Sequence, residues 1–430
     1  MPTINLPDLH AGQIEIWKNR GRKNAVRCGR RFGKTKLLET IACDVAAKGG
    51  NAGVFTPEYK QWEEIFRDCK NILKPIYSSA SKTDGLILTN TNGQIDFWSL
   101  NDNDLAGRGR KYNVVLLDES AFTKNGQMYD TWQKAIEPTL LTTRGSSFVF
   151  STPSGIDEEN FFYRICHDAS LGFTQHYAPS AANPYVPVDE LAQLEKKTHP
   201  LVFQQEYRAE FISWANATFF KLEYFLDEAG LPVSYPTKCD LVFAVLDCAV
   251  KSGTEHDATG TLYCAYSRLP EPNIVWLDYE MDSVDAAFLD QVMSERVLTR
   301  LEELARECGA RLGSLGMFVE DAAGGSVMLQ NARSRENVAP LIHAIDSKMT
   351  AKGKDERSII AGGPISSGAV KISQYAFDKI VDWKGRSANH LLKQVTTFRL
   401  GDKDAARRAD DLHDSAMYSV IVALTDKRQI

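Results

Sequence analysis

The strongest constraint on the fold is an alternation of short apolar runs with helical patterns in the first half of the chain. The runs that read as strands are 24–28, 51–56, 94–100, 112–120 and 146–153. Strands that alternate with helices favour a parallel sheet, because each parallel pair needs a long crossover connection, which is usually a helix. We therefore predict an α/β unit with helices on both faces of a parallel sheet.

A second α/β pattern follows a proline-containing stretch. Strand-like runs at 241–247, 259–267 and 273–281 suggest an antiparallel meander, since a PEPN turn separates the last two. A long helical pattern at about 284–308, a strand ending near 321 and a helix from about 409 complete it. The 430 residues exceed what one hydrophobic core usually serves. We predict domains at 1–212 and 235–430, joined by a linker at 213–234.

Composition narrows the class of protein. No run of about 18 apolar residues is present, and the first residues lack the pattern of a signal peptide, so we expect a cytosolic protein without a membrane partner. The eight cysteines show no zinc-site spacing, and we expect them to be reduced. A net charge of −6 argues against a protein that is permanently coated with DNA, although local cation clusters remain, as at Arg407 and Arg408.

The run 24–28 leads through GRRFGKT into a helical pattern, which is the context that a Walker A motif requires. Backbone N–H groups of the loop, from Gly29 to Gly33, can cradle phosphate at the helix start. Lys34 can reach the β- and γ-phosphates of ATP, and the Thr35 hydroxyl can bind Mg²⁺. Cys28 stands where the first glycine of the motif belongs, which weakens the match.

Two further strands end in polar residues that suit a nucleotide site. The apolar run VVLL ends in Asp118 and Glu119, as a buried parallel strand does at a ligand crevice. We expect Asp118 to hold Mg²⁺ through water and Glu119 to polarise the attacking water. The next strand ends in Ser151 and Thr152, whose hydroxyls can sense the γ-phosphate. The alternative is a strand end capped by solvated acids.

A second group of acids comes from three segments of the C-terminal half. They are Asp247, the pair Glu320 and Asp321, and the helix start with Asp410, Asp411 and Asp414. Residues 411 and 414 share one helix face. Two Mg²⁺ ions about 4 Å apart need this density of oxygen ligands to cleave a phosphodiester, and Mn²⁺ can substitute. Any single acid here has an ordinary alternative as a cap or a solvated terminus.

The order of these motifs resembles the large-subunit family of tailed-phage DNA-packaging terminases. The resemblance rests on an upstream glutamine, a deviant P-loop with arginines, a strand ending in DE and an STP segment. Segments 56–61, 105–119 and 203–211 also match. The resemblance implies an N-terminal ASCE-type P-loop ATPase domain and a C-terminal RNase H-like nuclease domain with a mixed sheet and flanking helices.

The resemblance also implies residue roles. Gln13 corresponds to an adenine-contacting glutamine, Arg30 or Arg31 to a P-loop arginine near the γ-phosphate, and Arg108 to an arginine offered by a neighbouring subunit. Among the acids, Asp247, Asp411 and Asp414 match the nuclease pattern. The middle acid is Glu320 or Asp321, with Asp321 slightly favoured, and Asp257 matches a position that often holds Asp.

The implied function is ATP-driven translocation of double-stranded DNA into procapsids, with metal-dependent cutting of concatemeric DNA. The implied partners are the small terminase subunit and the portal protein, on which the chain forms a homo-oligomeric ring in the cytoplasm of the infected bacterium. A cationic loop at 346–360 would track the DNA backbone. The main alternative is a helicase-like DNA-dependent ATPase whose second domain only clamps DNA.

Overall fold

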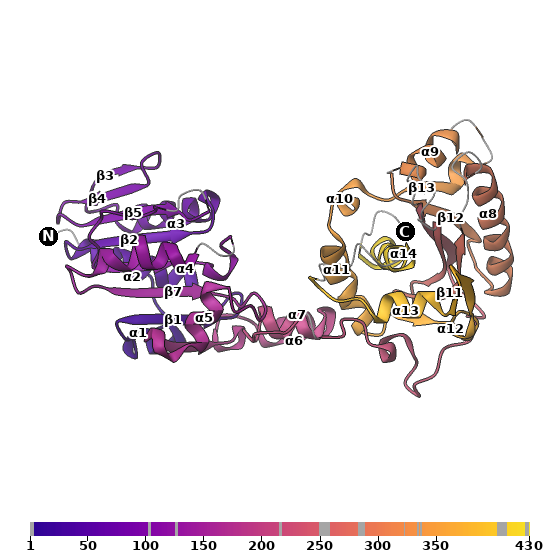
Figure 1. Ribbon diagram of the computed structural model, residues 1–430, viewed down its shortest axis with the longest axis horizontal. Helices are drawn as coiled ribbons and strands as arrows, with labels where there is room; N and C mark the ends of the chain where they lie inside the picture. The colour runs from indigo at the N-terminus through magenta and orange to yellow at the C-terminus, as the bar shows by residue number, and fades with distance from the viewer. Residues whose placement is uncertain are drawn as a thin grey trace. The chain divides into compact units, whose positions relative to one another are not determined.

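The computed structural model describes two compact units, each built on its own sheet (Figure 1). One unit comprises Met1–Gln193 and Leu201–Ser213, and the other comprises Leu194–Pro200 and Trp214–Ile430. The described residues are all except 1–3, 102–104, 125–127, 215–216, 249–258, 283–288, 322, 333–334, 336–337, 402–410 and 426–429. No helix in this part of the chain is long and apolar enough to cross a membrane.

The first unit contains an eight-stranded sheet in the order β3-β4-β5-β2-β6-β7-β1-β8. Six strands run parallel: β1 (Lys23–Cys28), β2 (Asn51–Thr56), β5 (Gln94–Ser99), β6 (Val114–Leu117), β7 (Ser146–Ser151) and β8 (Thr174–Ala178). At one end of the sheet, β3 (Tyr77–Ser81) and β4 (Leu86–Thr89) pair antiparallel with their neighbours. The predicted parallel α/β unit is confirmed. Because β7 lies between β1 and β6, the ends of these three strands meet at one edge of the sheet.

Alternation along the strands explains why helices cover both faces of this sheet. Val26 and Leu116 pack on one face with α1 (Ala11–Lys18), α2 (Lys34–Ala47) and α3 (Tyr59–Ile72). Their neighbours Ala25 and Leu117 pack on the other face with α5 (Phe161–His167) and the residues after α4 (Met128–Thr131). The helices α6 (Val188–Lys197) and α7 (Pro200–Glu206) follow, and their residues from Leu194 to Pro200 are counted with the second unit.

The second sheet is mixed, in the order β13-β12-β9-β10-β11-β14. The strands β9 (Leu241–Cys248), β10 (Thr259–Ser267) and β11 (Asn273–Asp282) form the predicted antiparallel meander, which is confirmed. The strand β12 (Ser314–Val319) pairs in parallel with β9, β13 (Ile342–Ala344) with β12, and β14 (Val370–Ile372) with β11. A separate hairpin joins β15 (Val381–Trp383) to β16 (Arg386–Ala388).

Helices lie on opposite faces of the second sheet (Figure 1). On one face are α8 (Leu289–Glu307) and α9 (Ala323–Ala332). On the other are α14 (Asp411–Val420), α11 (Lys354–Ser366) and α13 (His390–Thr396), while α10 (Ser347–Thr350) and α12 (Gln374–Asp378) are short. The segment expected as a linker at 213–234 packs here as well, because Phe219, Phe220 and Phe225 are buried and Phe225 stacks on Trp276.

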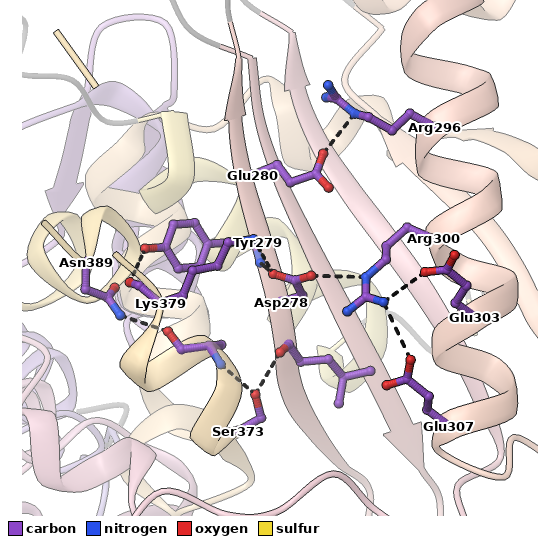
Figure 2. A network of polar contacts seen from close by, with 12 residues as sticks. Asp278, Tyr279, Glu280, Arg296, Arg300, Glu303, Glu307, Ser373, Lys379 and Asn389 are labelled. Carbon is purple, nitrogen blue, oxygen red and sulfur yellow. Dashed lines mark hydrogen bonds and ion pairs between the residues drawn. The ribbon is translucent and has the colours of Figure 1, made fainter. Parts of the chain in front are cut away.

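A buried carboxylate holds α8 to the sheet. Asp278 on β11 accepts hydrogen bonds from Lys379 at 2.6 Å and from Arg300 of α8 at 3.1 Å (Figure 2). Arg300 also pairs with Glu303 at 3.0 Å. A buried charge is tolerated only when it is paired and hydrogen-bonded. The network therefore fixes the packing of α8 on β11.

Candidate functional site

The loop between β1 and α2 is shaped by two glycines. Gly33 adopts a left-handed conformation with φ of 100° directly before α2. A β-carbon on Gly29 would lie 2.4 Å from the carbonyl oxygen of Tyr207, so no side chain fits there. Cys28, in contrast, is the last residue of β1 and pairs in register with Ala178, with its side chain in the core. A side chain is therefore accommodated where the usual motif has its first glycine.

Lys34 lies at the start of α2 and points toward the ends of two neighbouring strands. Its Nζ donates to Oγ1 of Thr152 at 3.0 Å and lies 3.4 Å from Oε1 of Glu119. Only 7% of its side chain is exposed. Glu119 has a positive φ of 48°, and its buried Oε2 has no hydrogen-bond partner in the described structure. Lys34 and Glu119 therefore lie in one site, and Oε2 of Glu119 can accept a hydrogen bond from a water molecule.

Thr35 and Asp118 form the second contact of this site. The Thr35 hydroxyl donates to Oδ2 of Asp118 at 2.9 Å. Burial, reinforced by the neighbouring Glu119, raises the pKa of Asp118 to about 6. A hydroxyl and carboxylates at this spacing are oxygen ligands of the kind that Mg²⁺ prefers, and the orphaned Glu119 oxygen beside them also fits a hydrated ion. The residues present therefore fit a magnesium–nucleotide complex.

The two hydroxyls that end β7 have different contacts. Ser151 is fully buried and accepts a hydrogen bond from the backbone N–H of Ala121 at 3.1 Å. Thr152 contacts Lys34. Ser151 therefore ties β7 to the turn that follows Glu119, whereas Thr152 is the residue that touches the loop lysine.

Gln13 lies beneath the loop. Its Nε2 donates to the carbonyl of Gly33 at 2.8 Å, and its Oε1 accepts from the backbone N–H of His10 at 3.0 Å. The His10 ring in turn contacts the carbonyl of Phe32 at 2.9 Å. In this arrangement both ends of the Gln13 amide support the backbone of the loop, and no sequence motif identified His10 as part of that support.

The arginines selected from the sequence differ in environment. Arg30 forms an ion pair with Glu206, and its backbone N–H donates to the Glu206 carbonyl at 2.7 Å. Arg31 has a positive φ of 63° and an exposed side chain. Arg108 is exposed on a turn before β6. Of these three, Arg31 combines a position in the loop with a side chain for which the described structure gives no ion pair.

The sheet of the second unit brings three acidic segments together. In the parallel pair β9–β12, Val319 lies opposite Leu246, so Asp247 and Glu320 follow at adjacent strand ends. On the other side of β9, Asp247 pairs with Gly260. A β-carbon on Gly260 would lie 2.8 Å from the backbone carbon of Asp411. The start of α14 therefore lies against Gly260 on β10, the residue that pairs with Asp247 on β9.

The two candidates for the middle acid occupy different surroundings. Asp321 is exposed and accepts a hydrogen bond from the Ser326 hydroxyl at 2.7 Å. Glu320 is half-buried, and burial raises its pKa although the charge of Arg357 opposes the change. Which of the two serves as the middle acid stays a prediction. Asp410 and Asp257 lie outside the described residues.

Asp414 is neutralised by cations of α11. Its Oδ1 accepts from Arg357 at 2.9 Å, and its Oδ2 lies 3.5 Å from Nζ of Lys354. Among the residues that the structure describes, no group of three or more His, Cys, Asp or Glu side chains is placed to hold a metal ion. In the described structure Asp414 is engaged by a guanidinium and an ammonium group, and the expected two-metal centre stays a prediction.

The expected cationic loop at 346–360 is instead helical. It contains α10 and the first half of α11. Arg357 is buried, donates to the carbonyl of Lys352 at 2.8 Å and lies 4.8 Å from the ring centre of Tyr418. This cation is therefore part of the acid cluster, while Lys348 remains exposed.

No protein-family model matches the chain. Over 133 residues it is 31% identical to the terminase large subunits of Thermus virus P23-45 and Thermus phage G20c, which covers 27% of this chain and 26% of each relative. The large terminase of a thermophilic bacteriophage shares the fold, with a TM-score of 0.52 and 11% identity over 98% of this chain and 100% of that one. The chain is thus similar to phage terminase large subunits in sequence over this stretch and in fold over nearly its whole length.

The terminase likeness predicted from the motifs is thus confirmed, and so is the two-part α/β fold. The large terminase of the same thermophilic bacteriophage, in complex with ADP, gives a TM-score of 0.50 at 12% identity, over 97% of this chain and 99% of that one. The sequence match spans about a quarter of the length of the curated terminases, so activity, substrates and partners are argued separately below.

Proposed function

We propose that the first unit hydrolyses ATP to drive double-stranded DNA into a viral procapsid. The observation that carries the proposal is the convergence of Lys34, Thr152 and Glu119 with the Thr35–Asp118 pair at the ends of three adjacent strands. The large terminase of the thermophilic bacteriophage, which has the same fold, has been solved in complex with ADP. Such an edge of a parallel sheet is where α/β proteins bind nucleotides.

The residues of this site divide the work of phosphoryl transfer. Lys34 binds the phosphate oxygens, so its contacts with Thr152 and Glu119 pass to the nucleotide. Thr35 and Asp118 hold Mg²⁺, which neutralises charge on the phosphates. Glu119 accepts a proton from the attacking water through the oxygen for which the described structure gives no protein partner. Gln13 and His10 hold the loop backbone in position.

Arg108 is proposed to complete the site of a neighbouring subunit, because an arginine offered across an interface stabilises charge in the transition state. This role requires a homo-oligomeric ring, which we place on the portal protein in the cytoplasm of an infected bacterium. A small terminase subunit is the proposed partner for choosing where DNA is cut.

For the second unit we propose endonucleolytic cutting of concatemeric DNA at the edge that carries Asp247, Glu320 and Asp411, with Mg²⁺ or Mn²⁺ as the expected cofactor. The ion pairs of Asp414 with Arg357 and Lys354 favour a second candidate, a unit that only clamps DNA. The two differ in one test: the nuclease cuts plasmid DNA when Mn²⁺ is added, and Asp247→Asn abolishes that cutting.

The ATPase proposal is tested by Lys34→Ala, compared with Lys48→Ala at the other end of α2, where the lysine side chain is 73% exposed. We expect Lys34→Ala to lose ATP hydrolysis and Lys48→Ala to retain it. Cutting of plasmid DNA should survive in both variants, because the two sites share no residue. Normal hydrolysis by a folded Lys34→Ala protein would refute the proposal.

A further inference from the structure

The turn that carries Arg108 is built to present one side chain. Gly107 and Gly109 flank Arg108 with φ values of 78° and 81°, which L side chains rarely adopt. The N–H of Arg108 donates to the carbonyl of Leu105 at 3.0 Å, and the N–H of Arg110 to that of Gly107 at 3.1 Å. These two tight turns leave Arg108 exposed at the tip.

The base of the turn packs on buried rings. A β-carbon on Gly107 would lie 2.8 Å from the ring of Phe55, so the backbone itself packs there. Ala106 is fully buried, and Tyr112, which ends the turn, is 1% exposed. The rings of Phe55 and Tyr112 meet edge to face at 6.2 Å. The turn is therefore fixed at both of its ends.

Asp96 on β5 contacts two residues that follow Arg108 in the chain, Arg110 and Tyr112. Its Oδ2 accepts a hydrogen bond from the Tyr112 hydroxyl at 2.8 Å, and its Oδ1 lies 3.7 Å from Nη2 of Arg110. The amide of Gln94 donates to both carboxylate oxygens, at 2.8 and 2.9 Å. Asp96 is only 3% exposed. Every polar partner described for this carboxylate thus comes from its own strand or from the arginine turn.

A second layer of contacts reinforces the same two residues. The indole N–H of Trp98 donates to the Tyr112 hydroxyl at 3.0 Å, and the Arg110 guanidinium lies 5.9 Å from the centre of the Trp98 ring. A buried charge of this kind often adds little net stability compared with apolar residues of the same size. The effect of the Asp96 carboxylate here is on geometry, because its contacts with Arg110 and Tyr112 fix the position of the turn relative to the sheet.

We propose that Asp96 is a positioning residue for Arg108. By holding Arg110 and Tyr112, its carboxylate fixes the turn so that Arg108 projects from the surface at a set place before a partner arrives. The inference rests on the proposed role of Arg108 at the nucleotide of a neighbouring subunit. A preorganised arginine is effective because misplacement of a catalytic group by about 1 Å costs about 100-fold in rate.

The test uses Asp96→Asn, which keeps the shape and the acceptor for Tyr112 but removes the charge that attracts Arg110. We expect kcat for ATP hydrolysis by the assembled full-length protein to fall about 10- to 100-fold, with the KM for ATP within about 3-fold of wild type. Asp130→Asn is the matched control, because Asp130 is exposed on α4 of the same unit and pairs with the exposed Lys134. That control should hydrolyse ATP at the wild-type rate.

A mixing experiment separates positioning from general damage. Asp96→Asn protein has an intact P-loop, and Lys34→Ala protein has an intact arginine turn, so their mixture should regain hydrolysis that neither shows alone. The double variant D96N/R110Q should be no slower than the slower single variant, because both changes release the same turn. If Asp96→Asn fails to fold, Tyr112→Phe tests the same turn, because it removes the hydrogen bond between Tyr112 and Asp96.

Three outcomes decide the matter. If Arg108→Ala is slow but Asp96→Asn and Tyr112→Phe are as fast as wild type, Asp96 has no positioning role and the proposed role of Arg108 stands. If Asp96→Asn raises the KM and the mixture recovers nothing, the carboxylate serves only structure and the inference is overturned. If Arg108→Ala itself hydrolyses ATP normally in assembled protein, the underlying trans mechanism is wrong.

Discussion

The Nζ atom of Lys34 lies 3.0 Å from the hydroxyl oxygen of Thr152, which follows β7 directly. This contact joins the phosphate-binding loop to the strand that separates it from the acidic strand β6. When Lys34 binds a nucleotide phosphate, its hydrogen bond to Thr152 is broken. The hydroxyl is therefore placed to respond to the presence of the γ-phosphate.

We expect Thr152→Val to lower kcat for ATP hydrolysis about 10-fold, because the hydroxyl released from Lys34 can hydrogen-bond to charged groups around the γ-phosphate in the transition state, and such a bond is worth about 1.5–3 kcal/mol. ATP affinity, measured by titration with a fluorescent analogue, should change by less than about 3-fold, because Lys34 keeps its phosphate contacts. An unchanged kcat would limit Thr152 to a structural contact.

Glu119→Gln should bind ATP and turn it over about 100-fold more slowly, the usual scale for losing a general base. Glu137→Gln is a suitable control, because this glutamate pairs with Lys23 at the opposite end of β1. Single-turnover hydrolysis with radiolabelled ATP measures the chemical step directly. Normal turnover would remove Glu119 from the reaction.

Glu320→Gln should abolish metal-dependent cutting of plasmid DNA, whereas Asp321→Asn should leave most of it. The reason is placement, because Glu320 is half-buried near Arg357 while Asp321 is exposed and bonded to Ser326. Gel electrophoresis of supercoiled plasmid with Mn²⁺ measures the loss. The reverse pattern would restore Asp321 as the middle acid.

Arg357→Met should lower the free energy of unfolding of the second unit by about 3–5 kcal/mol, because it removes the closest cation from Asp414, whose side chain is only 13% exposed. Lys348→Met, in an exposed position of the same segment, should change it by less than about 0.5 kcal/mol. Urea denaturation followed by tryptophan fluorescence gives both values. The double variant R357M/D414N should recover part of the loss; if it is no more stable than R357M, the ion pair is not the cause.

Glu39 gives the first unit a pH-dependent stability. Burial raises its pKa to about 7, although its partner Lys36, 2.7 Å away, opposes the change. The folded unit therefore holds this proton more tightly than the unfolded chain, and its contribution to stability falls as pH rises from about 4.5 to 7. Glu39→Gln should stabilise the unit at pH 8 relative to wild type by on the order of 2 kcal/mol, and less at about pH 5. Equal effects at both pH values in thermal melts would contradict the assignment.

The sequence was sufficient for the elements that local patterns define. Apolar runs predicted five strands of the first sheet but missed β3, β4 and β8. The GKT turn and the DE strand end predicted where Lys34 and Glu119 would meet. Contacts between distant segments had no local signal. The pairing of Arg30 with Glu206 spans 176 residues, and that of Arg357 with Asp414 spans 57, so neither could be read from spacing. Chain periodicity also could not show that the lysine-rich stretch would fold as α11 and turn its arginine inward.

The close approach of Gly260 to the backbone of Asp411 has a consequence for recognising distant relatives. A carboxylate can be supplied from more than one position after a strand, as the two candidates Glu320 and Asp321 after β12 illustrate. Backbone contact offers no such freedom, because any side chain at position 260 would push the start of α14 away from β10, the strand that pairs with Asp247. Over long evolutionary distances, this glycine should be a more durable landmark of the second unit than any one of its carboxylates.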